Sequence, residues 1–188
     1  MVARSPAAAS AFTFRSGRLC LDFAATLMFR GTDEPSELLI DGAAFARWAL
    51  ESGVVSRPVR GITDPGEAIE LREAVYRSAT PRLAASSPAV ADRRTLNRFA
   101  GHAPVVPSLT EDGTLARVGT FTEVIASIAR DAVELFGGEE AERLRQCGRD
   151  GCTRLFVDRS RGANRTWCGM RQCGNRVNAA AYRRRHRA

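Results

Sequence analysis

The chain has 188 residues, 44% of them hydrophobic, and 28 basic against 21 acidic side chains give it a net charge of +7. This length suits one sizeable domain with a small additional module, and the composition is that of a globular protein. Because no apolar run approaches the roughly eighteen residues of a membrane span, a membrane-spanning protein is excluded. Residues 1–11 lack the apolar stretch of a signal peptide, so we expect the chain in the cytoplasm.

The first predicted elements lie before residue 54. The apolar run 19–28 fits either a strand leading into a helix or one buried helix, and its periodicity does not decide between them. Asp41 is a suitable N-cap for a helix that carries Phe45 and Trp48 inward, and Gly53 would end that helix.

A further capped helix is predicted to begin near residue 65. Asp64 can cap it, Pro65 suits the first helical position, and Glu67 can complete a capping box. Arg72 is expected to point outward from this helix, and a shorter helix follows from Asp92. The expected inward stripe consists of Ile69, Leu71, Val75 and Tyr76.

The part of the chain from residue 12 to about residue 142 is called the body below. In its last part, the sequence predicts a hairpin and a long helix. Residues 105–118 contain an Asp-Gly step between two β-prone runs, which is typical of a hairpin turn. Thr120 and Glu123 form a capping box at the start of a helix that Gly137 would end. The body is therefore predicted to be an α+β domain, mostly helical with a small antiparallel sheet.

Asp22 is the candidate ligand-binding residue of the body, because it interrupts an apolar run. It fits either a carboxylate bonded to a helix end or to buried backbone, or an acid facing a ligand in a pocket. Cys20 is expected in the core and His102 at the surface. Since these residues form no catalytic constellation, we do not expect an enzyme.

Four of the five cysteines form two pairs near the C-terminus, each with four residues between its members and with fifteen residues between the pairs. Two such pairs predict one structural zinc ion with four thiolate ligands, which leave no open position for a catalytic water. A disulfide interpretation is weaker, because the cytoplasm is reducing and Cys20 would stay unpaired. The predicted ligands are Cys147, Cys152, Cys168 and Cys173.

The stretch between the cysteine pairs predicts a hairpin. Residues 153–158 are β-prone, residues 161–164 form a turn, and residues 165–168 would return as a second strand to the third cysteine. A helix from Cys173 onward completes the knuckle, hairpin and helix of a treble-clef zinc finger. The small core beside the metal is expected to contain Leu155, Phe156 and Trp167.

The C-terminal helix carries the charge of the module. From Arg143 onward, 13 arginines against two acids give a charge of +11, whereas the remaining 15 arginines and 19 acids give −4. A strongly basic end on an acidic body predicts a polyanionic partner, nucleic acid first of all. One stripe is expected to pack on the hairpin, namely Val177, Ala180, Ala181 and the stem of Arg184. The candidate nucleic-acid contacts are Asn175, Arg176, Asn178, Arg183, Arg184, Arg185 and Arg187.

Other interpretations of the module remain. Asn175 could cap the turn at the metal, and Arg176 could bond a cysteine sulfur or a carbonyl as support for the site. Trp167 and Tyr182 could stack on the bases of RNA, although Trp167 fits the core of the module better. The module could also dock an acidic protein.

The run 167–176, followed by Tyr182 and Arg183, resembles the CGNR zinc finger, and the upstream cysteine pair and residues 156–161 match it as well. The body resembles the ABATE domain, chiefly over residues 21–27, where Ala25 stands in place of an expected Asn. The resemblance covers nearly the whole chain.

The resemblance implies a bacterial protein in a family named for stress-induced transcription regulators. Residues 1–142 would form an α+β domain that senses a small ligand, and residues 143–188 a zinc finger that binds double-stranded DNA. If the two domains are independent, Cys168→Ser would unfold the finger and leave the melting of the body nearly unchanged.

Overall fold

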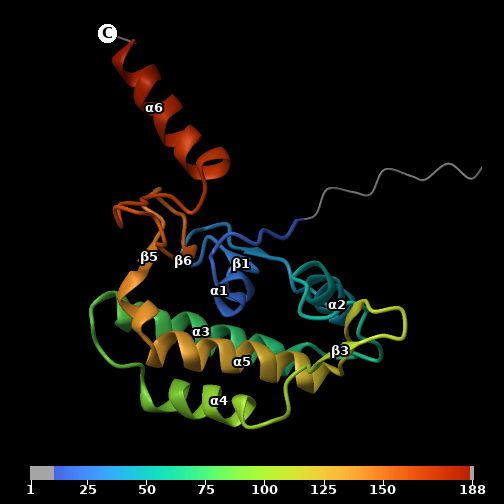
Figure 1. Cartoon of the computed structure of the whole chain (residues 1–188). Coiled ribbons are helices and arrows are strands. Elements are labelled where there is room, and N and C mark those ends of the chain that lie inside the picture. Colours follow the sequence, from blue (N-terminus) through green and yellow to red (C-terminus); the bar gives the residue numbers. More distant parts are fainter. Residues whose placement is uncertain (1–10, 187–188) are drawn as a thin grey trace, which may run out of the picture.

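The computed structural model describes residues 11–186, and the structural statements below refer to that part of the chain. The main layer of the body consists of three mutually packed helices, α3 (Gly66–Leu83), α4 (Val90–Ala100) and α5 (Phe121–Gly137) (Figure 1). Helix α1 (Leu19–Ala24) packs on α3 and α5. Helix α2 (Gly42–Glu51) joins this core through its aromatic rings, with the Trp48 ring centroid 4.8 Å from that of Phe23 in α1. The run 19–28 is a helix that leads into a short strand, so neither expected arrangement, a strand leading into a helix or one buried helix, is correct.

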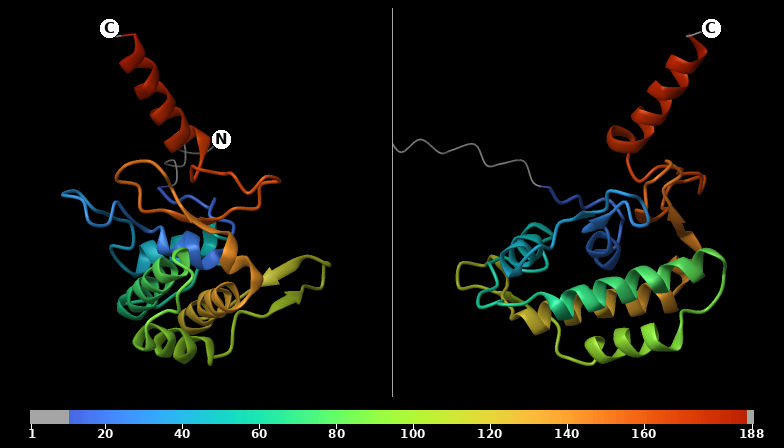
Figure 2. Two further views of the ribbon diagram at one scale, coloured as in Figure 1. Left: turned by 90° about the vertical axis from the view of Figure 1, so that its left-hand side faces the viewer. Right: turned by 180° about the vertical axis from the view of Figure 1, so that it is seen from behind.

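Three two-stranded antiparallel sheets accompany the helices in residues 11–186. The predicted α+β class is therefore confirmed, with helices forming most of the body. Figure 2 shows the β3–β4 hairpin projecting beyond the helices, at the Asp-Gly turn predicted from the sequence. The pairs are β1 (Leu27–Met28) with β2 (Ser36–Glu37), β3 (Pro107–Leu109) with β4 (Leu115–Arg117), and β5 (Leu144–Gln146) with β6 (Leu155–Val157).

Two of the predicted helix caps are confirmed by their hydrogen bonds. The Asp41 carboxylate accepts the N–H of Ala44 at 2.7 Å at the start of α2. At the start of α5, Thr120 and Glu123 form the predicted reciprocal capping box. These side chains satisfy N–H groups that have no partner within the helix.

The start of α3 differs from the prediction by one residue. Asp64 accepts the N–H of Gly66 at 2.8 Å, but the helix begins at Gly66, so Pro65 precedes the first helical position. Glu67 makes no capping hydrogen bond. The short Asp64 side chain turns the chain locally before the helix starts, which replaces the capping box.

The prediction that Arg72 points outward is wrong, because its side chain is only 2% exposed. Its guanidinium lies 2.6 Å from the Glu37 carboxylate of β2 and 2.7 Å from that of Glu73, its neighbour in α3. A buried cation is tolerated when it is paired and hydrogen-bonded in this way. Arg72 therefore ties the β1–β2 hairpin to α3, a contact that the periodicity of one helix cannot indicate.

The predicted hairpin between residues 153–158 and 165–168 is also wrong. Strand β6 pairs instead with β5, which precedes the first cysteine, and the register places Leu144 opposite Val157. Residues 165–168 form no strand, and bends occur at residues 167 and 168. The β5 sequence Leu-Arg-Gln has little β-propensity, so its strand depends on this pairing rather than on a local signal.

Strand β6 divides its side chains between two cores. Leu155 and Val157 are buried in the body core, together with Leu144 of β5, whereas Phe156 packs against the cysteines. This follows from the alternation of side chains along a strand. The expectation that Leu155 belongs to the core beside the metal is therefore wrong. The β5–β6 hairpin instead contributes Leu144, Leu155 and Val157 to the body core.

Helix α6 (Asn175–Arg185) stands away from the rest of the molecule (Figures 1 and 2). None of its residues is buried, and it packs mainly on the preceding turn of π-helix, η2 (Met170–Gly174). The predicted packing of the stripe of Val177 and Ala180 on the hairpin is therefore wrong. Its apolar residues are small, and Leu155 and Val157 of the hairpin are already covered by the body core.

Candidate metal centre

The sulfur atoms of the four predicted ligands all lie within 4.8 Å of one another, and all four residues are buried. The distance between the Cys168 and Cys173 sulfurs is 3.4 Å, and those from Cys152 are 3.8 Å to Cys173 and 4.0 Å to Cys168. A tetrahedral zinc site with Zn–S bonds of about 2.3 Å needs sulfurs about 3.8 Å apart. Cys147, Cys152, Cys168 and Cys173 therefore form a site suited to a single zinc ion.

Short backbone turns bring the cysteines together. The knuckle after β5 is closed by the N–H of Cys147, which donates to the carbonyl of Arg154 at 2.9 Å. Gly151 has a φ of +75° in this knuckle, a left-handed conformation that favours glycine. Cys168 donates its N–H to the Cys147 sulfur at 3.4 Å, and Cys173 lies in the η2 turn. Both cysteine pairs are thus held mainly by the backbone.

The thiols perturb one another in the cluster. A hydrogen bond from the Cys168 thiol lowers the pKa of Cys152 to about 5. The hydrogen bond between Cys152 and Cys168 also raises the pKa of Cys168 far above its usual range. Burial raises the pKa of Cys173 to about 11. One thiolate thus forms readily, while further thiolates are opposed by burial and by their neighbours. Zinc, when bound, would supply the positive charge that stabilises all four as thiolates and would cross-link the module.

Arg165 supports this site in a way that sequence reasoning missed. Its guanidinium donates to the carbonyls of Trp167 at 3.0 Å and Cys168 at 2.6 Å, and it lies 4.2 Å from the Phe156 ring centroid. These bonds fix the segment that carries the third cysteine. The sequence held no signal for this role, because Arg165 is one of 13 arginines in the module.

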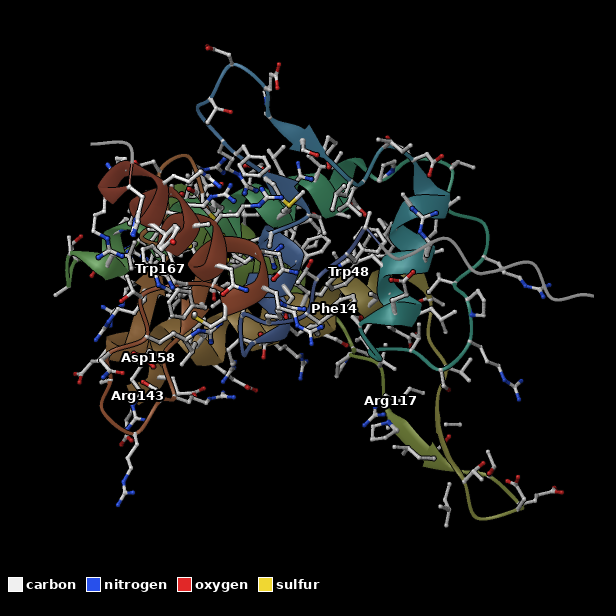
Figure 3. The ribbon with its side chains drawn as sticks, turned by 90° about the horizontal axis from the view of Figure 1, so that it is seen from above. Phe14, Trp48, Arg117, Arg143, Asp158 and Trp167 are labelled. Atoms are coloured by element: carbon white, nitrogen blue, oxygen red, sulfur yellow. The ribbon has the colours of Figure 1, made fainter. Side chains whose placement is uncertain are left out.

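Asp158 fixes the loop that leads to Arg165. It is buried, and its carboxylate accepts the N–H groups of Ser160 and Arg165, both at 2.9 Å. Its own N–H donates to the carbonyl of Arg143 at 2.8 Å, and the two residues lie side by side in Figure 3. The loop 158–165 is therefore anchored at both ends without a second strand.

The predicted nucleic-acid residues are exposed along α6, apart from Arg187, which lies outside the described residues. Within residues 11–186, none of their side chains makes a hydrogen bond or an ion pair. Neither a cap by Asn175 nor a bond from Arg176 to a cysteine is present, so support of the metal site falls to Arg165 instead. The exposed residues are Asn175, Arg176, Asn178, Arg183, Arg184 and Arg185.

The two aromatic side chains of the module lie in different surroundings. Trp167 is half-buried against the cysteine cluster, and Figure 3 shows it below α6. Tyr182 is 57% exposed and stacks on His186, with ring centroids 4.0 Å apart. Trp167 therefore belongs to the core of the module, as expected, and Tyr182 does not.

Asp22 is bonded to backbone, as in the first of its two interpretations. Its carboxylate accepts the N–H groups of Arg15 and Ser16, both at 2.9 Å, and it lies 3.9 Å from the Arg154 guanidinium of the module. Burial raises its pKa. Asp22 thus links the first segment of the body to the module.

A second link crosses the same junction at Glu140, in the 3₁₀ helix η1 (Glu139–Arg143). Its carboxylate lies 2.6 Å from the guanidinium of Arg159 in the module and 2.9 Å from that of Arg18 in the body. The hydrogen bond from Arg159, and then that from Arg18, lowers the pKa of Glu140 to about 2. A depressed pKa means that this contribution to stability is present above pH 4.5 and is lost as the pH falls toward 2.

Glu140→Gln should accordingly lower the free energy of unfolding at pH 7 by up to about 1 kcal/mol, the range of partly exposed ion pairs. Urea unfolding at pH 7, 5 and 3 would measure the difference from wild type, which should shrink between pH 5 and pH 3. Glu139→Gln is the matched control, because Glu139 is an exposed neighbour without an ion pair in the described structure. An equal effect of both substitutions, or one independent of pH, would contradict the assignment.

Residues 17–139 match the family model of ABATE, described as "Putative stress-induced transcription regulator". The chain belongs to the ABATE family. Residues 143–186 of this ABATE protein match the CGNR zinc finger and contain all four cysteines. The two families and their order, predicted from the sequence, are thereby confirmed. A search of curated proteins found no match to the chain.

The helices of residues 11–186 were also compared with the length and hydropathy that a bilayer requires. No helix in this part of the chain combines the length and the apolar character of a membrane span.

Proposed function

We propose that this ABATE protein is a transcription regulator that binds double-stranded DNA through its zinc finger and α6. The observation that carries the proposal is the set of exposed arginines on α6, whose guanidinium groups have no ion-pair partner within residues 11–186. Cations that the protein does not neutralise are available to phosphates, and each such contact releases counterions.

The shape of the module supports a duplex target. Helix α6 has 11 residues and is about 16 Å long, and it stands clear of the body. The major groove of DNA, about 12 Å wide, admits such a helix. The polar lining of a groove between the knuckle and α6 consists of one acid, Asp150, and four arginines, so the groove is net positive and suits a phosphate backbone. The arginines are Arg149, Arg176, Arg183 and Arg184.

In this proposal the residues of α6 have two roles. Asn175, Arg176 and Asn178, beside the metal site, contact base edges or nearby phosphates. The arginines further along the helix contact phosphates and set the salt dependence of binding. These further residues are Arg183, Arg184, Arg185 and Arg187.

RNA is the second candidate target, because the exposed Tyr182 ring could stack on an unpaired base. Trp167 is half-buried and offers less surface for stacking, which favours the duplex. An acidic protein partner is the third candidate, and it requires the same arginines but no preference for nucleic acid.

In this proposal, residues 1–142 form a ligand-sensing domain and residues 143–188 form the DNA-binding finger. We further propose that the protein acts in the cytoplasm, where thiols stay reduced, and that it is not an enzyme. Four thiolates would complete the shell of a tetrahedral zinc ion and leave no position for a reacting water.

Titration of the zinc-loaded protein into labelled duplex DNA and single-stranded RNA, at several salt concentrations, tests the proposal. We expect tighter binding to the duplex and a steep linear decrease of log K with log salt concentration. Tighter binding to RNA would favour the second candidate. Absence of binding to either at low salt would refute nucleic-acid binding and favour the acidic protein partner.

A further inference from the structure

A cavity of about 250 Å³ lies at the junction of the body and the finger. Its body wall comes from residues 11–29, and its finger wall comes from residues 149–154 and 168–176. Both walls contribute to the cavity, which is partly open to solvent. The cavity is smaller than the clefts of about 300–1,000 Å³ that hold drug-sized ligands, so it suits a small molecule.

The polar part of the cavity wall is basic. Among the residues that the structure describes, four arginines and no carboxylate line the cavity. Arg15 donates to the neutral amide of Gln172, and Arg149 lies over the Phe29 ring at 5.5 Å. Within residues 11–186, only one of the four guanidinium groups lies within 4 Å of a carboxylate, since that of Arg154 lies 3.9 Å from Asp22. The four are Arg15, Arg149, Arg154 and Arg176.

The metal site offsets part of this charge but not all of it. Three of the cysteines line one end of the cavity. A zinc ion bound by four thiolates has a formal charge of −2, and Asp22 adds one further negative charge. Four guanidinium groups therefore leave about one positive charge without compensation. A ligand with a single negative charge would complete the balance.

Another part of the cavity wall is apolar. Ala25, Leu27, Met28 and Phe29 of the body line the cavity beside the arginines. An inorganic anion would leave this surface without a partner. An apolar group attached to an anionic head would cover it, and its burial would add to the affinity.

We infer that the junction cavity binds a small monocarboxylate with an apolar body, its carboxylate held by the arginines and its apolar group held against Leu27, Met28 and Phe29. Planar guanidinium groups bind carboxylates in a bidentate manner. Asp22 orients Arg154 from behind the wall. Because the cavity has walls from both domains, the ligand contacts the body and the finger at once. This inference does not depend on nucleic-acid binding.

Isothermal titration calorimetry of the zinc-loaded full chain tests the inference with three probes. Benzoate has both the charge and the apolar ring, benzamide has the ring without the charge, and acetate has the charge without the ring. We expect benzoate to bind at least about tenfold more tightly than either of the others. Absence of benzoate binding up to about 10 mM, or equal binding of benzamide, would overturn the inference.

Two variants locate the site. Arg176→Gln removes a side chain that makes no hydrogen bond or ion pair in the described structure, and Arg149→Gln removes a second guanidinium from the knuckle. Each should weaken benzoate binding by about tenfold without loss of zinc. Arg161→Gln is the matched control, because this exposed arginine of the module does not line the cavity. Wild-type benzoate affinity in both variants, or equal weakening by Arg161→Gln, would overturn the assignment. The readout needs no nucleic acid, so it is distinct from the test of the proposed function.

Discussion

Cys168→Ser should remove zinc from the protein and lower the thermal unfolding midpoint of the whole chain by about 10 °C or more. The reason is the shared core, because Leu144, Leu155 and Val157 of the module are buried with the helices of the body. Burial of each such side chain contributes about 1.5–3 kcal/mol, and for a chain of this size 1 kcal/mol corresponds to about 2–4 °C. Loss of order around the metal would therefore lower the free energy of unfolding of the body as well.

Zinc content measured by atomic absorption and unfolding followed by calorimetry would check this result. Cys20→Ala is the matched control, because Cys20 is buried in the body core outside the cysteine cluster, and this variant should keep one zinc ion per chain. Two separate transitions, with the body melting at the wild-type temperature, would contradict the account. That outcome is the one predicted from the sequence alone, where the two domains were taken as independent.

Replacement of Arg183, Arg184 and Arg185 by Ala should weaken duplex binding by up to about 500-fold at 0.1 M salt. For B-DNA each phosphate contact makes the slope of log K against log salt concentration more negative by about 0.9, so three lost contacts reduce the magnitude of this slope by about 2.7. The arginines make no intramolecular bond in residues 11–186, so the fold should be unaffected. Fluorescence anisotropy with a labelled duplex at four salt concentrations would measure both quantities.

The control for this variant removes the same charge from the body. Arg57, Arg60 and Arg94 are exposed there, away from the finger, and their joint replacement by Ala should change the slope little. If both triple variants lose equal affinity, net charge rather than α6 governs binding. If neither loses affinity, α6 is not the nucleic-acid interface.

The sequence predicted best those features that depend on neighbouring residues. Helix caps at Asp41 and Thr120, the Asp-Gly hairpin and the end of α5 at Gly137 all follow from local hydrogen bonds and backbone preferences. The cysteine spacing predicted the metal ligands for the same reason, since each pair closes a short turn. These signals do not require knowledge of distant partners.

The errors arose where a distant partner decides the structure. Arg72 is buried because Glu37 lies across from it, and β5 is a strand because β6 pairs with it. Leu155 packs in the body because strand alternation turns Phe156 toward the cysteines. The two walls of the junction cavity are likewise at least 120 positions apart in the sequence, so no local pattern could indicate the cavity.

The most direct test of the central claim joins the metal site to nucleic-acid binding in one titration. Zinc would be added stepwise to chelator-treated protein in the presence of labelled duplex DNA, and anisotropy would report binding. We predict no binding without zinc and full recovery at one equivalent, because the ordered finger presents α6. Duplex binding that is as tight without zinc as with it would contradict the account.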